Sequence, residues 1–170
     1  MPTLYIITGP AGAGKSTVSR RIAETKKKSA LIEGDDIYGQ IKGGYIDPWE
    51  EGNYLDTFWK LCLSQMKIYL EDGFDVVFNY IISPDQLAMI KNAFPDAKIV
   101  FAVIMVDADE LLRRDSERLP EFQMKARCIV LLDEFRKHNY APECIVNTTD
   151  MTVDEAVKVV DSEDRFVVNN

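Results

Sequence analysis

The sequence predicts an α/β fold built around a parallel β-sheet, and three observations support this prediction. Short apolar runs alternate with helical patterns along the 170-residue chain, which is the order that crossover helices impose on parallel strands. These runs are continuously apolar, as expected for strands that helices cover on both faces. A glycine-rich loop joins the first run to the first helical pattern. We expect a single domain over residues 1–170.

The strands and helices can be assigned in chain order. The expected strands are residues 3–8, 30–33, 75–80, 98–106 and 143–147. The longer helices are expected at residues 15–27, 52–72 and 121–138, where apolar side chains recur at helical spacing. Three further pairs have the spacing of a helix-capping box. These pairs are Ser83 with Gln86, Asp107 with Glu110, and Thr152 with Glu155.

The loop "GPAGAGKST" at residues 9–17 fits the pattern G-x-x-x-x-G-K-[ST] of a Walker A phosphate loop. Its glycines let consecutive N–H groups point into one concavity, and the following helix presents its positive dipole end there. We expect Lys15 to reach the β- and γ-phosphates of a nucleotide and the Ser16 hydroxyl to bind Mg²⁺. The expected nucleotide-binding residues of the loop are Gly9, Pro10, Ala11, Gly12, Ala13, Gly14, Lys15, Ser16 and Thr17.

Composition narrows the classes of partner. The formal net charge of −8 argues against a nucleic-acid or anionic-membrane surface. The three cysteines lie far apart in apolar segments, as reduced core residues of a cytoplasmic protein do. The N-terminus has no signal-peptide pattern, and no segment approaches the length of a membrane span. We expect a cytoplasmic monomer or weak dimer whose partners are small molecules.

Ligands of such sheets bind outside the carboxyl ends of the strands, so polar residues there are candidates for chemistry. Asp35 and Asp36 follow the second strand. One carboxylate at this place can orient an acceptor hydroxyl and take its proton, or contact Mg²⁺ through water. The alternative for either residue is that it caps the next helix.

The third strand ends in Asn79, where a Walker B strand usually ends in an acid that holds Mg²⁺ through water. An amide can still bond a metal-bound water, but it brings no charge. The metal is then expected to depend more on Ser16, the nucleotide and the pair Asp35 and Asp36.

Three arginines follow the fourth strand, in a segment that we expect to form a lid over residues 113–123. Arg113, Arg114 and Arg118 lie on or just after a helix that begins near residue 107. Arginines at this place can close over the phosphates and stabilise the transferring group. The alternative is a solvated charged face, because Asp115 and Glu117 lie between them.

These motifs resemble the small P-loop kinases of metabolites and antibiotics, such as gluconate kinases, shikimate kinases and chloramphenicol phosphotransferases. The phosphate loop, the Gly-Asp pair after the second strand, "ADELLRRDSER" and "NTTDMTVDEAV" carry the resemblance, which is strongest to bacterial gluconate kinases. It implies a three-layer P-loop NTPase fold with strand order 2-3-1-4-5, the cofactors ATP and Mg²⁺, and an acceptor pocket between the second and third strands. We expect the acceptor-binding segment at about residues 35–60. The resemblance also implies that Asp35 is the base, that Arg114 and Arg118 are lid arginines, and that the adenine lies near Arg113 and the loop after Asn147.

The acceptor segment departs from the gluconate kinase pattern. Residues 40–53 contain Lys42 as their only cation, whereas a carboxylate acceptor normally requires a bidentate arginine. With Tyr38, Tyr45 and Trp49 close by in the sequence, the segment favours a neutral or partly aromatic acceptor.

The leading interpretation is an ATP-dependent kinase that transfers the γ-phosphoryl group to a hydroxyl of a metabolite or antibiotic-like molecule. A nucleoside or nucleotide kinase is the nearest alternative, and a non-catalytic nucleotide-binding module stays open because of Asn79. A GTP-binding switch is disfavoured. Residues 147–150 read N-T-T-D where the guanine-reading motif N-K-x-D requires a lysine.

Overall fold

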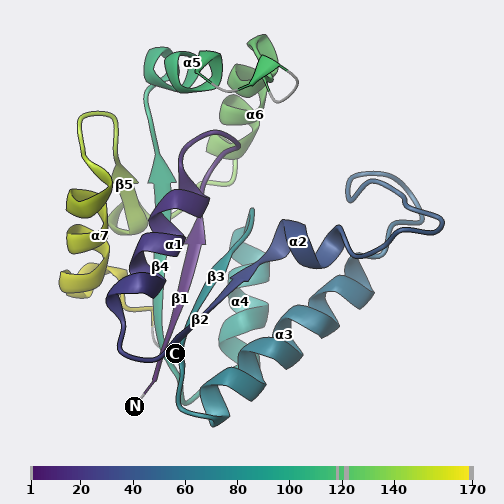
Figure 1. The fold of residues 1–170 in the computed structure, drawn as a ribbon, viewed down its shortest axis with the longest axis vertical. Coiled ribbons are helices and arrows are strands. Elements are labelled where there is room, and N and C mark those ends of the chain that lie inside the picture. The colour runs from purple at the N-terminus through teal and green to yellow at the C-terminus, as the bar shows by residue number, and fades with distance from the viewer. Residues whose placement is uncertain (1, 118, 121–122, 169–170) are drawn as a thin grey trace.

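The computed structural model describes residues 2–117, 119–120 and 123–168, and these residues form one five-stranded parallel sheet (Figure 1). The strand order is β2-β3-β1-β4-β5, which confirms the predicted order. The strands are β1 (Thr3–Thr8), β2 (Ser29–Glu33), β3 (Asp75–Asn79), β4 (Lys98–Met105) and β5 (Ile145–Asn147). Every residue of β1, the central strand, is buried, which explains why its sequence does not alternate.

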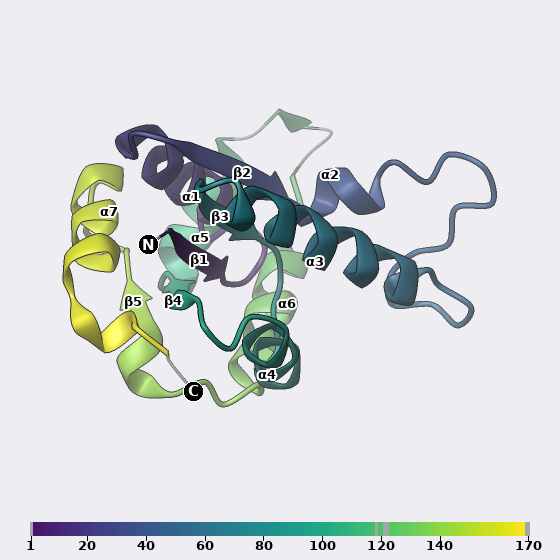
Figure 2. The ribbon, with the colours of Figure 1, turned by 90° about the horizontal axis from the view of Figure 1, so that it is seen from below.

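Helices cover both faces of the sheet and make it the middle of three layers (Figure 2). They are α1 (Lys15–Thr25), α2 (Gly34–Tyr38), α3 (Leu55–Glu71), α4 (Pro84–Ala93), α5 (Ala108–Ser116), α6 (Ala126–Arg136) and α7 (Val153–Ser162). Alternate residues of β1 face opposite layers, since Leu4 and Ile6 pack with α3 and α4, while Tyr5 and Ile7 pack with α1 and α7. No helix among these described residues is long and apolar enough to cross a membrane.

Several boundaries differ from the sequence-based expectation. Residues 143 and 144 lie in a short 3₁₀ turn, Pro142–Cys144, because Pro142 cannot donate to a strand ladder. The last long helix begins at Ala126, after Lys125 takes a positive φ of 51°, and the two residues expected to open it lie outside the described part of the chain.

Two of the three predicted capping boxes are confirmed, at Ser83 and at Thr152. The third is wrong. Asp107 occupies the N-cap of α5, but its side chain accepts a hydrogen bond from Asn147 Nδ2 at 3.1 Å and makes no cap bond. Glu110 does not reach back to the cap because it pairs with two arginines of the same helix.

A long connection between α2 and α3 projects from the domain as an arm, which we define as residues 39–54 (Figure 1). Tyr38 ties the two ends of the arm together. Its hydroxyl donates to the Ile46 carbonyl at 2.7 Å and accepts from the Tyr54 N–H at 3.2 Å. The predicted acceptor segment, residues 35–60, consists of α2, this arm and the first turns of α3.

Candidate active site

The phosphate loop leaves β1 and enters α1 at the carboxyl edge of the sheet. Gly9 passes so close to β4 that a Cβ atom would lie 2.2 Å from the Ile104 carbonyl oxygen. Gly14 is the N-cap of α1, with a φ of 96°, and it makes no side-chain cap hydrogen bond. Lys15 Nζ folds over the loop and donates to the Pro10 carbonyl at 3.3 Å. The loop therefore has the backbone shape that an anion-binding concavity requires.

A polar cluster beside the loop joins three segments that are remote in the sequence. Asn79 Nδ2 donates to Ser16 Oγ at 2.9 Å and to Glu33 Oε2 at 3.1 Å. The parallel pairing of β2 and β3 sets Glu33 directly beside Asn79. Asn79 is 5% exposed, and its Oδ1 atom is buried without a hydrogen-bond partner. This cluster lies at the predicted metal site.

Glu33 is the residue that the sequence analysis missed. It is the last residue of β2, and in the strand order 2-3-1 the end of β2 must lie next to the end of β3. The resemblance had already implied this strand order. The presence of an acidic residue at the end of the second strand was therefore the signal that could have identified Glu33. Its carboxylate brings to the cluster the negative charge that Asn79 lacks.

The donor set fits a magnesium ion. Mg²⁺ prefers oxygen ligands and is usually held by a few protein oxygens together with water and phosphate. The Ser16 hydroxyl, the Glu33 carboxylate and the unpartnered Asn79 Oδ1 are oxygens of that kind. In the described ranges, no group of three or more His, Cys, Asp or Glu could hold a metal ion by itself. A nucleotide would therefore have to supply further ligands.

Asp35 lies in the first turn of α2, close to the phosphate loop and exposed to solvent. The surrounding protein partly removes water from its carboxyl group, and this raises the pKa of Asp35 above the ordinary aspartate value. Lys15 opposes the shift, while Glu33 and Asp36 add to it. The interaction with Lys15 shows that the predicted base and the predicted phosphate-binding lysine share one site.

The lid arginines differ in what they contact. Arg114 Nη1 donates to the Ala13 carbonyl at 3.3 Å and its Nη2 to the Thr148 carbonyl at 3.1 Å, so it bridges the phosphate loop and the segment after β5. Arg113 is exposed and pairs with Glu110 and Glu117. Arg114 is therefore the arginine that the structure brings to the loop.

Glu110 holds both arginines at once, at 2.7 Å from Arg113 Nε and 2.6 Å from Arg114 Nε. Hydrogen bonds from the two guanidinium groups lower the pKa of Glu110 to about 2. The predicted lid residue Arg118 lies outside the described part of the chain.

A cavity of about 370 Å³ lies between the phosphate loop, α5 and α7. Gly12, Ala13 and Gly14 line one side of it, and Arg113 and Arg114 line another. The far wall comes from Thr148, Met151, Thr152, Val153 and Ala156. This is the side on which the resemblance places the adenine, near Arg113 and the segment after Asn147.

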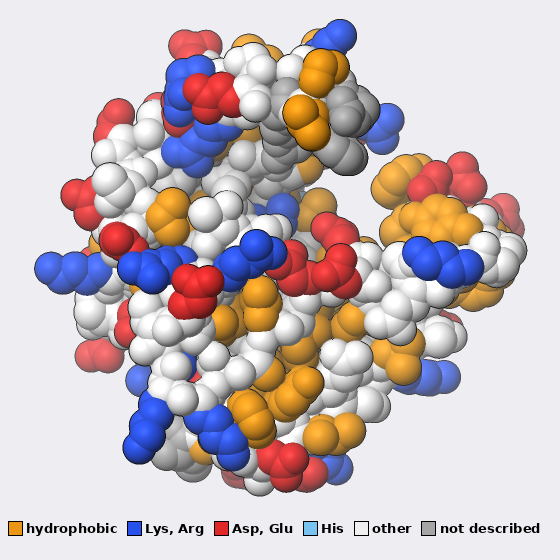
Figure 3. Space-filling view, viewed as in Figure 1, with side chains coloured by type: hydrophobic (Ala, Val, Ile, Leu, Met, Phe, Trp, Pro, Cys, Tyr) orange, Lys and Arg blue, Asp and Glu red, His pale blue; other side chains and the backbone are white. Residues whose placement is uncertain are grey.

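On the other side of the loop, Figure 3 shows a hollow between the arm and the part formed by α5 and α6, with acidic side chains at its base over α2.

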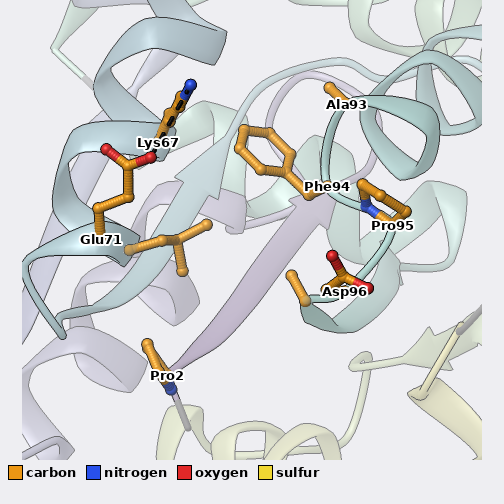
Figure 4. A pocket seen from close by; sticks show the side chains of 9 residues that line it. Pro2, Lys67, Glu71, Ala93, Phe94, Pro95 and Asp96 are labelled. Atoms are coloured by element: carbon orange, nitrogen blue, oxygen red, sulfur yellow. Dashed lines mark ion pairs between the residues drawn. The ribbon is translucent and has the colours of Figure 1, made fainter.

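A different cavity, of about 400 Å³, lies at the opposite end of the sheet between α3 and α4 (Figure 4). Pro2 and Phe94 line it, together with Lys67 and Glu71, whose charged groups lie 3.8 Å apart. None of the predicted site residues in the described part of the chain lines this cavity.

Gly34 has a steric role between Asp35 and the end of β3. A Cβ atom at this position would lie 2.5 Å from Tyr80 Cδ2, so the ring of Tyr80 packs directly on the glycine backbone. The missing side chain thus makes room for an aromatic ring beside the predicted base, Asp35.

We expect Gly34→Ala to push the Tyr80 ring away and raise the KM for the acceptor about tenfold, with the KM for ATP unchanged. Overpacking of this kind also destabilises a protein by about 1–3 kcal/mol, which a thermal melt would record. Gly43→Ala is the matched control, because nothing lies within 4 Å of a Cβ atom at that position. Equal effects of the two changes on the acceptor KM would contradict this role of Gly34.

A three-layer fold with this loop between β1 and α1 defines a P-loop nucleotide-binding protein. A family model described as an AAA domain matches residues 4–127, and the chain belongs to this family. The chain is also 21% identical to guanylate kinase 2, chloroplastic/mitochondrial, of Oryza sativa subsp. japonica. That match covers 95% of this chain and 63% of the rice protein, so the chain spans less than two thirds of the relative's length.

Solved structures of kinases share the fold. A sugar kinase from Janibacter sp. HTCC2649 superposes with a TM-score of 0.68 at 14% identity, covering 93% of this chain and 91% of that one. A gluconokinase from Sinorhizobium meliloti 1021 superposes with a TM-score of 0.59 at 20% identity, covering 94% and 89%. At these identities the likeness establishes the fold, which is that of small-molecule P-loop kinases and confirms the resemblance noted from the sequence.

Proposed function

We propose that the protein is an ATP-dependent kinase that phosphorylates a hydroxyl group of a small molecule. The observation that carries the proposal is the meeting of three parts at one edge of the sheet. These parts are the phosphate loop, the cluster of Ser16, Asn79 and Glu33, and the Asp35 carboxylate. The names of the sugar kinase and the gluconokinase support the same class.

In the proposed reaction the acceptor oxygen attacks the γ-phosphorus, and the bond from that phosphorus to the β–γ bridging oxygen breaks. ADP leaves with the bonding electron pair, and the acceptor's hydroxyl proton passes to Asp35. Lys15 and Arg114 neutralise charge on the phosphates. Ser16, Glu33 and Asn79 would hold Mg²⁺ directly or through water, and the ion would offset the negative charge of the transferring group.

The segment after β5 favours ATP over GTP as the donor. In the guanine-reading motif the asparagine side chain contacts the base. Here the side-chain amide of Asn147, the last residue of β5, is hydrogen-bonded to other residues of the chain. Its Nδ2 donates to Asp107, and its Oδ1 accepts from the Thr149 N–H at 3.0 Å and from the Thr149 hydroxyl at 2.7 Å. A base would have to displace these bonds.

A nucleotide kinase is the second candidate, and the guanylate kinase likeness favours it. A transfer screen separates the two, with Mg²⁺-ATP as donor and a panel of sugars, nucleosides, nucleoside monophosphates, phenicols and aminoglycosides as acceptors. We expect product with an acceptor that carries no phosphate. Transfer only to nucleoside monophosphates would establish the second candidate, and ATP binding without transfer or hydrolysis would leave a binding module. The proposal includes a cytoplasmic monomer or weak dimer with no nucleic-acid partner.

We expect Asn79→Asp to tighten Mg²⁺ binding to the ATP complex severalfold, because a second carboxylate would face the ion. Without the ion the same change removes the bonds from Nδ2 and sets two carboxylates side by side, since Glu33 Oε2 lies 3.1 Å from Nδ2. The Mg²⁺-free protein should therefore lose about 1–3 kcal/mol of unfolding free energy. Thermal melts with and without Mg²⁺-ATP measure both effects.

The complementary variant is Glu33→Gln, which keeps the shape of the side chain and removes the charge. We expect it to weaken Mg²⁺ binding where Asn79→Asp strengthens it. Unchanged Mg²⁺ affinity in both variants would show that the cluster does not hold the metal.

A further inference from the structure

A second cavity at the active-site edge has Asp35 in its wall. It has a volume of about 330 Å³, near the lower end of the roughly 300–1,000 Å³ typical of small-molecule sites. Trp49 from the arm, Leu55 from α3, and Tyr80 and Ile81 after β3 form its apolar walls. The cavity therefore lies on the acceptor side of the predicted base, opposite the cavity between the phosphate loop and α7.

The lining of this cavity is negatively charged, although Lys15 of the phosphate loop acts on Asp35 from outside it. Asp35 is the only acidic residue among the described residues that line it, and none of those residues is a lysine or an arginine. Burial raises the pKa of Asp35, Lys15 opposes that rise, and Glu33 and Asp36 add to it by repulsion. A carboxylate or phosphate on the acceptor would add a further negative charge, with no cation in these walls to pair with it.

The walls offer a surface for a ring. Trp49 is 72% exposed, and it borders the cavity beside Pro48. The Tyr80 ring, held against Gly34, forms part of the opposite wall. A ring that stacks on such side chains is stabilised beyond the effect of the area it buries.

Polar groups border the cavity on its remaining side. Ser83 and Gln86 come from the start of α4, and His138 comes from just after α6. His138 therefore brings the chain after α6 to this cavity, with a side chain that can hydrogen-bond a neutral polar group.

We propose that this cavity binds the acceptor, and that the acceptor is a ring-bearing alcohol that carries no carboxylate or phosphate. This inference rests on the proposed kinase function and adds to it the chemical class of the substrate. The aromatic and aliphatic walls bind the ring, the polar side orients it, and its hydroxyl faces Asp35.

Three benzyl alcohols with a neutral, a cationic and an anionic para substituent test the proposal. The probes are 4-(hydroxymethyl)benzamide, 4-(hydroxymethyl)benzylamine and 4-(hydroxymethyl)benzoate, titrated against the full chain with Mg²⁺-ADP and followed by ligand-detected NMR. We expect the amide and the amine to bind at least tenfold more tightly than the benzoate. Equal or tighter binding of the benzoate would overturn the proposal, and so would the absence of binding by all three up to their solubility limits.

Two variants locate the binding. Trp49→Leu should weaken binding of the amide at least fivefold. Tyr69→Leu is a similar aromatic-to-leucine change on α3, outside the cavity, and should leave that affinity unchanged. Equal effects of the two variants would count against this cavity as the site.

A measurement of ATP binding distinguishes failure of this inference from failure of the proposed kinase function. Absence of ATP binding in the same preparation would refute the proposed function. Preference for the benzoate in a protein that still binds Mg²⁺-ATP would refute only the acceptor class.

Discussion

Replacing Lys15 with methionine will lower phosphoryl transfer by about a hundredfold or more while the fold stays intact. The Lys15 side chain lies over the phosphate loop, where its Nζ donates to the Pro10 carbonyl and acts electrostatically on Asp35. Its loss therefore removes positive charge from the transition state and disturbs no core packing. The measurement is single-turnover transfer from Mg²⁺-ATP, with a thermal melt of the same protein.

Lys27→Met is the matched control, since Lys27 is an exposed lysine just after α1 and away from the loop. We expect it to keep the wild-type rate. A near-normal rate for Lys15→Met would refute the assignment of residues 9–17 as a functional phosphate loop.

Replacing Asp35 with asparagine will lower kcat by about a hundredfold or more, while ATP still binds. An amide is nearly the same shape as the carboxylate but cannot take the proton of the acceptor hydroxyl. The readouts are single-turnover transfer to the acceptor found by the screen and the dissociation constant of Mg²⁺-ATP. Unimpaired transfer by this variant would mean that another residue is the base.

Asp36→Asn provides the comparison for Asp35. Both residues lie in the first turn of α2, where successive side chains point about a hundred degrees apart, so one of them faces the site more directly. Neither residue belongs to the strand before them, because α2 begins at Gly34. We still expect Asp36→Asn to change turnover little and to alter stability by about 1 kcal/mol or less.

The pH dependence of the rate gives an independent check on the base. Because the pKa of Asp35 is raised, transfer should fall on acidification at a pH above that expected for an ordinary aspartate. Asp36 contributes to that rise by repulsion, so Asp36→Asn should move the acid limb to lower pH. An acid limb that stays in place in this variant would contradict the assignment of Asp35.

Local patterns in the sequence were sufficient for most of the fold. Continuous apolar runs predicted the strands, and β1 matches its expected bounds at both ends. The capping boxes at Ser83 and Thr152 formed because both partners lie within one helical turn. Asp107 failed as a cap because Asn147, 40 residues away, competes for its carboxylate.

By itself, the sequence determined the phosphate loop, since its function depends on the backbone of nine consecutive residues. Only the tertiary structure decided which acid accompanies Asn79, because Glu33 reaches it through the pairing of β2 with β3. It also decided that Arg114, rather than Arg113, contacts the loop. His138 and Trp49, 89 positions apart, line one cavity for the same reason. A site built from adjacent residues can be recognised in the sequence, whereas the walls of a cavity come from distant segments that only folding brings together.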